Sequence, residues 1–106
     1  MNWETRVTKL LGIQYPIIQG GLAHLAYSEL AAAVSNAGGL GQITAMSLEK
    51  PEDLREEIRK VKELTDKPFG VNFAIGQHNR SFSHFLEVAV EEKVPVITMT
   101  GGNPAP

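Results

Sequence analysis

The stretch PEDLREEIRKVKELTDKPFGVNFA, residues 51–74, decides the fold because it holds a helix and the strand that follows it. Pro51 suits a first helical turn, and apolar residues recur at helical spacing from Leu54 onward. This pattern predicts a helix over 51–65. Residues 69 to 73 or 74 form a short apolar run after a proline, which is typical of a buried strand.

The same alternation extends toward the amino terminus. Short apolar runs predict strands over 16–19 and 40–44, and the sequence between them predicts a helix over 28–37. Its expected inward face consists of Leu30, Ala33, Val34 and Ala37. A short capping helix or turn is expected over 5–11, and a loop over 45–50.

Toward the carboxyl terminus, a polar loop is expected over 76–81. A helix over 82–93 follows, with its inward face predicted at Phe82, Phe85, Leu86, Ala89 and Val90. The run VPVITMT, residues 94–100, predicts a further strand that ends in paired glycines. Strands that alternate with helices predict right-handed βαβ units, a parallel sheet and the α/β fold class.

The chain of 106 residues suits one domain, and we expect residues 1–106 to form it. Ten basic and twelve acidic residues, without a basic cluster, argue against a nucleic-acid partner. No apolar run approaches the length of a membrane span, and no signal peptide is evident, so we expect a cytoplasmic protein. The absence of cysteine excludes disulfides and thiolate nucleophiles.

Unusual residues gather where the predicted strands end. Gln19-Gly20-Gly21, Gln42 to Thr44, Asn72 and Thr100 to Asn103 all lie at carboxyl ends, which meet at one edge of a parallel sheet. Glycine lets a backbone approach a flat ligand closely. We therefore predict a bound planar ring, although a tight turn alone also explains Gly20-Gly21, and Asn72 also suits a simple strand end.

No catalytic or metal-binding group follows from spacing. His24, His78 and His84 have no carboxylates at metal-ligand spacing, so no metal is expected. The stretch GGLGQI lacks the third glycine of a dinucleotide fingerprint and precedes a strand rather than following one.

Four blocks of the sequence, YPIIQGGLAHLA, LAAAVSNAGGLGQI, LREEIRKVKELTDKPFGVNF and GGNP, resemble the nitronate monooxygenase family, formerly called 2-nitropropane dioxygenases. They also resemble the related FMN-dependent enoyl-acyl-carrier-protein reductase. The resemblance implies the amino-terminal half of a (β/α)8 barrel (TIM barrel), with about the first four of its eight strands in this chain. An incomplete barrel would leave open sheet edges.

The resemblance also implies FMN as cofactor. Gly20, Gly21 and Leu22 are expected to lie against the isoalloxazine through their backbone, and Asn72 to hydrogen-bond its polar edge. Family members more often carry Met at the position of Leu22, and some carry a hydroxyl residue at that of Ala74. The family's catalytic His and its FMN-phosphate loops belong to the second half of the barrel, so the catalytic His is expected beyond residue 106.

The expected activity is oxidation of alkyl nitronates with O2 as co-substrate. ITAMSLEKPEDLREEI favours this branch of the family. Reduction of an enoyl thioester is the alternative activity. A further alternative, from another class, is an inactive truncated half-barrel that associates with another chain, or forms a homo-oligomer, through its open edges.

Overall fold

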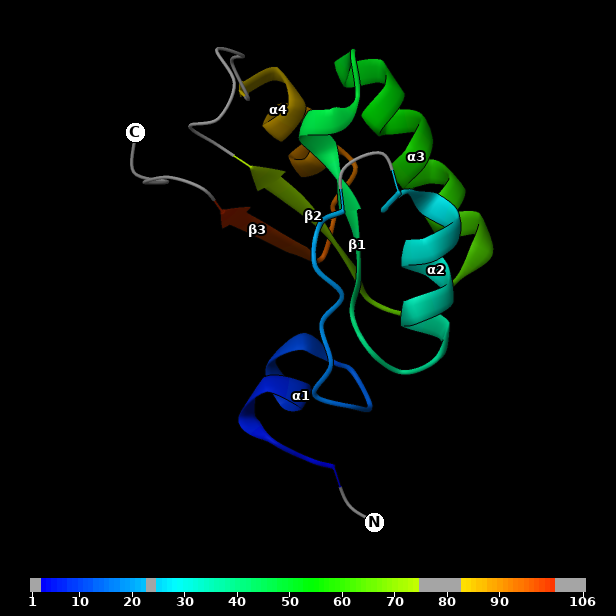
Figure 1. The fold of residues 1–106 in the computed structure, drawn as a ribbon, viewed down its shortest axis with the longest axis vertical. Helices are drawn as coiled ribbons and strands as arrows, with labels where there is room; N and C mark the ends of the chain where they lie inside the picture. The colour runs from blue at the N-terminus through cyan, green and yellow to red at the C-terminus, as the bar shows by residue number, and fades with distance from the viewer. Residues whose placement is uncertain (1–2, 23–24, 75–82, 101–106) are drawn as a thin grey trace.

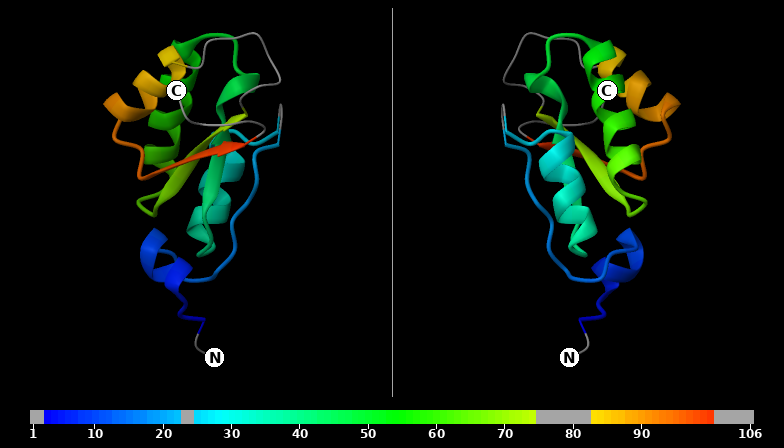
Figure 2. Two further views of the ribbon diagram at one scale, coloured as in Figure 1. Left: turned by 90° about the vertical axis from the view of Figure 1, so that its left-hand side faces the viewer. Right: turned by 90° about the vertical axis from the view of Figure 1, so that its right-hand side faces the viewer.

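A computed structural model describes residues 3–22, 25–74 and 83–100. The helices within residues 28–91 cover one face of a small sheet (Figures 1 and 2). In chain order the elements are α1 (Arg6–Leu11), α2 (Ser28–Asn36), β1 (Gly41–Thr44), the 3-10 turn η1 (Ala45–Ser47), α3 (Pro51–Leu64), β2 (Phe69–Ala74), α4 (Ser83–Glu91) and β3 (Val96–Thr100).

The sheet is parallel, with the strand order β1-β2-β3. Its register places Thr44 beside Asn72 and Asn72 beside Thr98. This arrangement confirms the predicted α/β alternation from residue 28 onward. Within the described residues β3 is an edge strand, while association with another chain through such an edge stays a prediction.

The predicted strand over 16–19 is wrong as a regular strand. This segment runs alongside β1, but it forms only one parallel bridge, between Ile18 and Leu40. The backbone N–H of Leu40 donates to Ile17 O, and that of Gln19 donates to Leu40 O. Pro16 has no N–H to extend the ladder backward, and in the forward direction the Gln19 side chain binds the β1 backbone.

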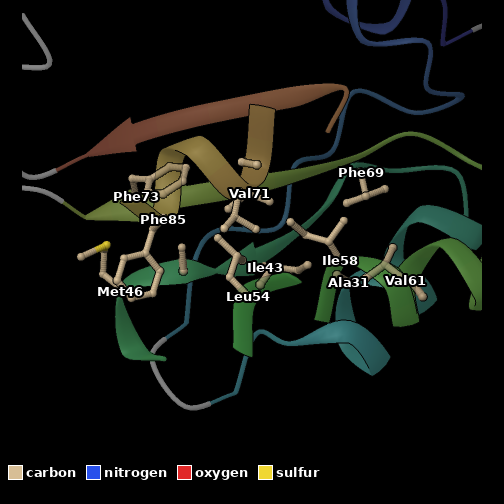
Figure 3. Packing of buried hydrophobic residues seen from close by; sticks show 14 residues of the cluster. Ala31, Ile43, Met46, Leu54, Ile58, Val61, Phe69, Val71, Phe73 and Phe85 are labelled. Carbon is tan, nitrogen blue, oxygen red and sulfur yellow. The ribbon is translucent and has the colours of Figure 1, made fainter. Parts of the chain in front are cut away.

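The hydrophobic core lies between the sheet and helices α2, α3 and α4. Figure 3 shows Val71 and Phe73 of β2 near Leu54 and Ile58 of α3. These four side chains are fully buried, and Phe85 of α4 joins the same cluster. Burial of such side chains is the main favourable term in folding, at roughly 1.5–3 kcal/mol each.

Helix α2 turns a different face to the core from the one predicted. Ala31, Ala32 and Ser35 are buried, whereas Ala33 and Ala37 are exposed, and Leu30 and Val34 are half-buried. The prediction followed the largest apolar side chains. The helix instead presents its smallest residues, because Gly41 of β1 approaches its backbone closely.

Other expectations about the core were also wrong in detail. Val90 of α4, which was predicted to face inward, is 63% exposed. The predicted loop over 45–50 contains η1, whose Met46 is buried in the core. The predicted loop over 76–81 and the inward position of Phe82 lie outside the described residues.

Helices α3 and α4 are joined by ion pairs. Arg55 donates to Glu91 and Glu92, at N···O distances of 2.9 and 2.8 Å. Arg59 donates to Glu92 at 3.2 Å. The Glu91 and Glu92 carboxylates raise the pKa of Arg55, and the hydrogen bonds from Arg59 and Arg55 lower the pKa of Glu92. This network fixes α4 against α3 on the outside of the molecule.

Candidate ligand-binding site at the carboxyl ends of the strands

The face of the sheet away from the helices carries a row of polar side chains. Side chains alternate along a strand, so Ile43 and Val71 point to the helical core while their neighbours Gln42 and Asn72 point to the opposite face. Gln42 and Asn72 are only 4% and 6% exposed. Buried amides require hydrogen-bond partners, and each of the two has them within the row.

Gln19 and Gln42 bind each other through side chains and backbone. The Gln19 side chain accepts from Gln42 N and donates to Gln42 O, both at 3.1 Å. In return Gln42 Nε2 donates to Gln19 O at 2.9 Å. The Gln19 amide also donates to the carbonyl of Gly20. These bonds fix the chain to β1 just before the glycine pair.

Thr98 of β3 connects this pair to Asn72 of β2. Its hydroxyl donates to Gln42 Oε1 at 2.6 Å, and it accepts from Asn72 Nδ2 at 2.9 Å. Thr100 Oγ1 lies 3.5 Å from the same nitrogen. The row therefore runs without interruption from Gln19 across all three strands.

The two glycines at positions 20 and 21 have different surroundings. A Cβ on Gly21 would lie 2.6 Å from Asn72 Oδ1, so this position has no room for a side chain. A Cβ on Gly20 would meet no atom within 4 Å. The packing of the described residues therefore explains the glycine at position 21 but not the one at position 20.

The residues at this edge fit a flat ligand with polar atoms on its rim. Gly20 leaves open space that a ligand in contact with the backbone would use. Thr44, next to Asn72 in the register, has a buried hydroxyl that finds no hydrogen-bond partner in the part of the chain that the structure describes. Such an orphan polar atom beside a polar row is consistent with a ligand partner. On both counts the site suits the isoalloxazine of FMN.

The structure brings three of the four predicted site residues together, namely Gly20, Gly21 and Asn72. The fourth, Leu22, follows them with its side chain 48% exposed. The glycines and Asn103 that follow β3 lie outside the described residues, as do His24 and His78. His84 is exposed on α4 beside Glu87, with 3.9 Å between Nδ1 and the carboxylate.

Sequence reasoning missed Thr98. The alternation of threonine with apolar residues in VITMT was the available sign, because it places Thr98 and Thr100 on one face of β3. It also missed the partners of Gln42, since an amide at a strand end does not reveal which backbone atoms it will bind.

A hollow of about 290 Å³ lies at the opposite end of the sheet, near the amino ends of the strands. Its lining includes Gly12, Ile13, Ser35, Gly38 and Pro68. In parallel α/β folds this end contributes stability, whereas ligands bind at the carboxyl ends. We therefore place the candidate site at the polar row rather than here.

The described residues lack two other kinds of feature. No group of three or more His, Asp or Glu side chains in these ranges is arranged to hold a metal ion. In the same ranges, no helix is both long and apolar enough to cross a bilayer.

Comparison with known proteins points to one family. The profile of the nitronate monooxygenase family matches residues 4–104. A probable nitronate monooxygenase from Staphylococcus saprophyticus is 49% identical over 94% of this chain and 31% of its own. A nitronate monooxygenase from Pseudomonas aeruginosa is 57% identical over 63% of this chain and 19% of its own.

Solved structures give the same result. FabK from Thermotoga maritima superimposes with a TM-score of 0.87 and 48% identity, over 95% of this chain and 32% of the FabK chain. Nitroalkane oxidase from Streptomyces ansochromogenes gives 0.76 and 26%, over 94% of this chain and 37% of its own. The chain thus spans about a third of these proteins, and its fold is a partial (β/α)8 barrel.

Proposed function

Because the chain belongs to the nitronate monooxygenase family, a family of oxidoreductases, we propose that it forms part of the FMN site of an enzyme that oxidises alkyl nitronates with O2. The observation that carries the proposal is the position of Gly20, an open glycine beside the buried polar row at the carboxyl edge of the sheet. A cytoplasmic location is part of the proposal, on the composition given above.

Each residue of the site has a separate task in this proposal. Gly20 leaves the backbone free to lie against the flat ring, and Leu22 offers exposed apolar surface next to it. Gly21 lies against Asn72 without a side chain between them, so that the Asn72 amide can meet the polar rim of the ring. Gln19 holds the turn in place through its bonds to the β1 backbone.

When bound, FMN supplies the electron transfer that the oxidation of a nitronate requires. The residues of this chain position the ring and exclude water from one side of it. A rigid, preorganised set of donors and acceptors costs no reorganisation during the reaction. We assign none of the described residues as the base that moves the substrate proton.

Reduction of an enoyl thioester is the second candidate, favoured by the 48% identity to Thermotoga maritima FabK. A dehydrogenase of a CoA thioester from Rhodococcus jostii is also 38% identical over 88% of this chain. The same row of residues would position FMN in either reaction. The two differ in the second substrate, which other residues must bind.

The proposed function is tested on the protein expressed from its own gene. We expect a flavin absorbance spectrum after purification or after addition of FMN, and O2 consumption on addition of propyl-2-nitronate. Reduction of crotonyl-CoA by NADH or NADPH, without nitronate oxidation, would replace the first candidate with the second. Failure to bind FMN at any concentration tested would overturn both.

A further inference from the structure

The hydrogen bonds of the polar row run in one direction. The first member is Gln19 O, a backbone carbonyl, which can only accept. Gln42 must therefore turn its Nε2 toward Gln19, at 2.9 Å, and its Oε1 toward Thr98, at 2.6 Å. The reverse orientation would place two acceptor oxygens against each other.

The same logic continues along the row. Because Gln42 Oε1 can only accept, the Thr98 hydroxyl gives its single proton to it. Thr98 Oγ1 is then left as an acceptor for Asn72, so Asn72 must present its Nδ2, at 2.9 Å. The orientation of each side chain is therefore fixed by the preceding one. The series starts at Gln19 O, the backbone carbonyl that precedes Gly20.

The last step concerns the other end of the Asn72 amide, its oxygen. With Nδ2 held by Thr98, the oxygen Oδ1 turns to Gly21, where it lies 2.6 Å from the place of a Cβ. Asn72 therefore offers an acceptor to whatever binds above the glycine turn. An oxidised isoalloxazine carries one ring N–H, at N3, whereas its other polar rim atoms only accept.

We infer that Gln42 and Thr98 are positioning residues that hold the Asn72 amide with its oxygen toward the ligand, so that the site selects a flavin by its N3–H. This inference rests on the proposed function for the identity of the ligand. The direction of the amide rests only on the hydrogen bonds within the chain.

The first experiment needs no flavin. NMR follows exchange with water of the Asn72 side-chain amide protons in the protein as its gene expresses it. In Thr98→Val, which keeps the shape and removes the hydroxyl, we expect exchange at least tenfold faster. Thr98→Ser keeps the hydroxyl and should preserve the wild-type rate, and circular dichroism checks that both variants are folded. Equal exchange in the wild type and Thr98→Val overturns the inference.

The second experiment uses FMN and 3-methyl-FMN, which lacks the N3–H. We expect the wild type and Thr98→Ser to bind FMN at least tenfold more tightly than the analogue, and Thr98→Val to bring that ratio close to one. A ratio unaffected by Thr98→Val overturns the role in selection. If neither flavin binds the wild type, the proposed function fails and the flavin part of the inference with it, while the exchange experiment still decides the amide orientation.

Discussion

Gly41 of β1 lies directly against the backbone of Ala31 in α2. A Cβ on Gly41 would fall 1.8 Å from Ala31 O and 2.5 Å from its carbonyl carbon. The buried Ser35, one turn further along α2, accepts a hydrogen bond from Gly41 N at 3.0 Å. The helix therefore rests on the strand by backbone contact, and no side chain separates them.

We predict that Gly41→Ala destabilises the fold strongly. The methyl group cannot be accommodated by a rotamer change, because the obstacle is backbone, so α2 must move away from the sheet. Overpacking of a core typically costs about 1–3 kcal/mol, and this site should lie at or above the upper end. Urea unfolding monitored by circular dichroism measures the change.

The matched control for that experiment is Gly20→Ala. Its added methyl group meets no atom within 4 Å, so unfolding should change by less than about 0.5 kcal/mol, as for an ordinary surface substitution. Similar losses of stability in the two variants would show that the contact between α2 and β1 is not the cause.

The sequence predicted the order of elements well because the relevant patterns are local. Helix α3 combines an initial proline, early acidic residues and an apolar stripe, and its observed bounds differ from the predicted ones by one residue. The face of α2 could not be read in the same way. Which of its sides faces the sheet depends on the closeness of Gly41, a tertiary contact that a helical pattern does not contain.

For the candidate site, the sequence predicts which residues lie close together but not which hydrogen bonds they form. Parallel strands bring their carboxyl ends to one edge, so the proximity of Gly21 and Asn72 followed from topology. The role of Thr98 depends on the register between β2 and β3. Register is set by the packing of whole strands, and no single motif in the sequence encodes it.

Gly20→Ala should also separate cofactor binding from folding. If a flavin ring lies against the backbone here, the methyl group occupies its space, and we expect FMN to bind at least about tenfold more weakly, equivalent to about 1.4 kcal/mol. Flavin fluorescence titration measures this. Unchanged affinity would mean that the ring does not contact Gly20.

Glu57 of α3 replaces a missing cap on α2. The N-cap residue Tyr27 makes no capping bond with its side chain, and Glu57 Oε1 accepts from Ser28 N at 2.9 Å instead. Glu57→Ala should destabilise the fold by about 1 kcal/mol, the usual cost of a lost cap. Glu57→Gln, which keeps an acceptor oxygen, should lose less. The neighbouring exposed Glu56→Ala is the control in thermal unfolding, and an equal loss there would refute the capping role.

The ion pairs between α3 and α4 predict how stability depends on pH. Hydrogen bonds from Arg59 and then Arg55 lower the pKa of Glu92 below its ordinary value of 4.5. In the acid range the unfolded chain therefore binds this proton more readily than the folded one. The stabilisation is complete above about pH 4.5 and is lost as the pH falls through the lower pKa of the folded protein.

Replacing Glu92 by Gln should make this contribution disappear. We expect Glu92→Gln to be less stable than the wild type at pH 7, by about 1 kcal/mol or less because partly exposed ion pairs are weak. The difference should shrink as the pH is lowered below 4.5, the ordinary pKa of the glutamate. Urea unfolding at a series of pH values measures it. Glu63→Gln removes the same charge from the exposed side of α3 and serves as the control for a change of net charge alone. A difference between Glu92→Gln and the wild type that stays constant across the acid range would show that packing of the side chain, and not its charge, joins the two helices.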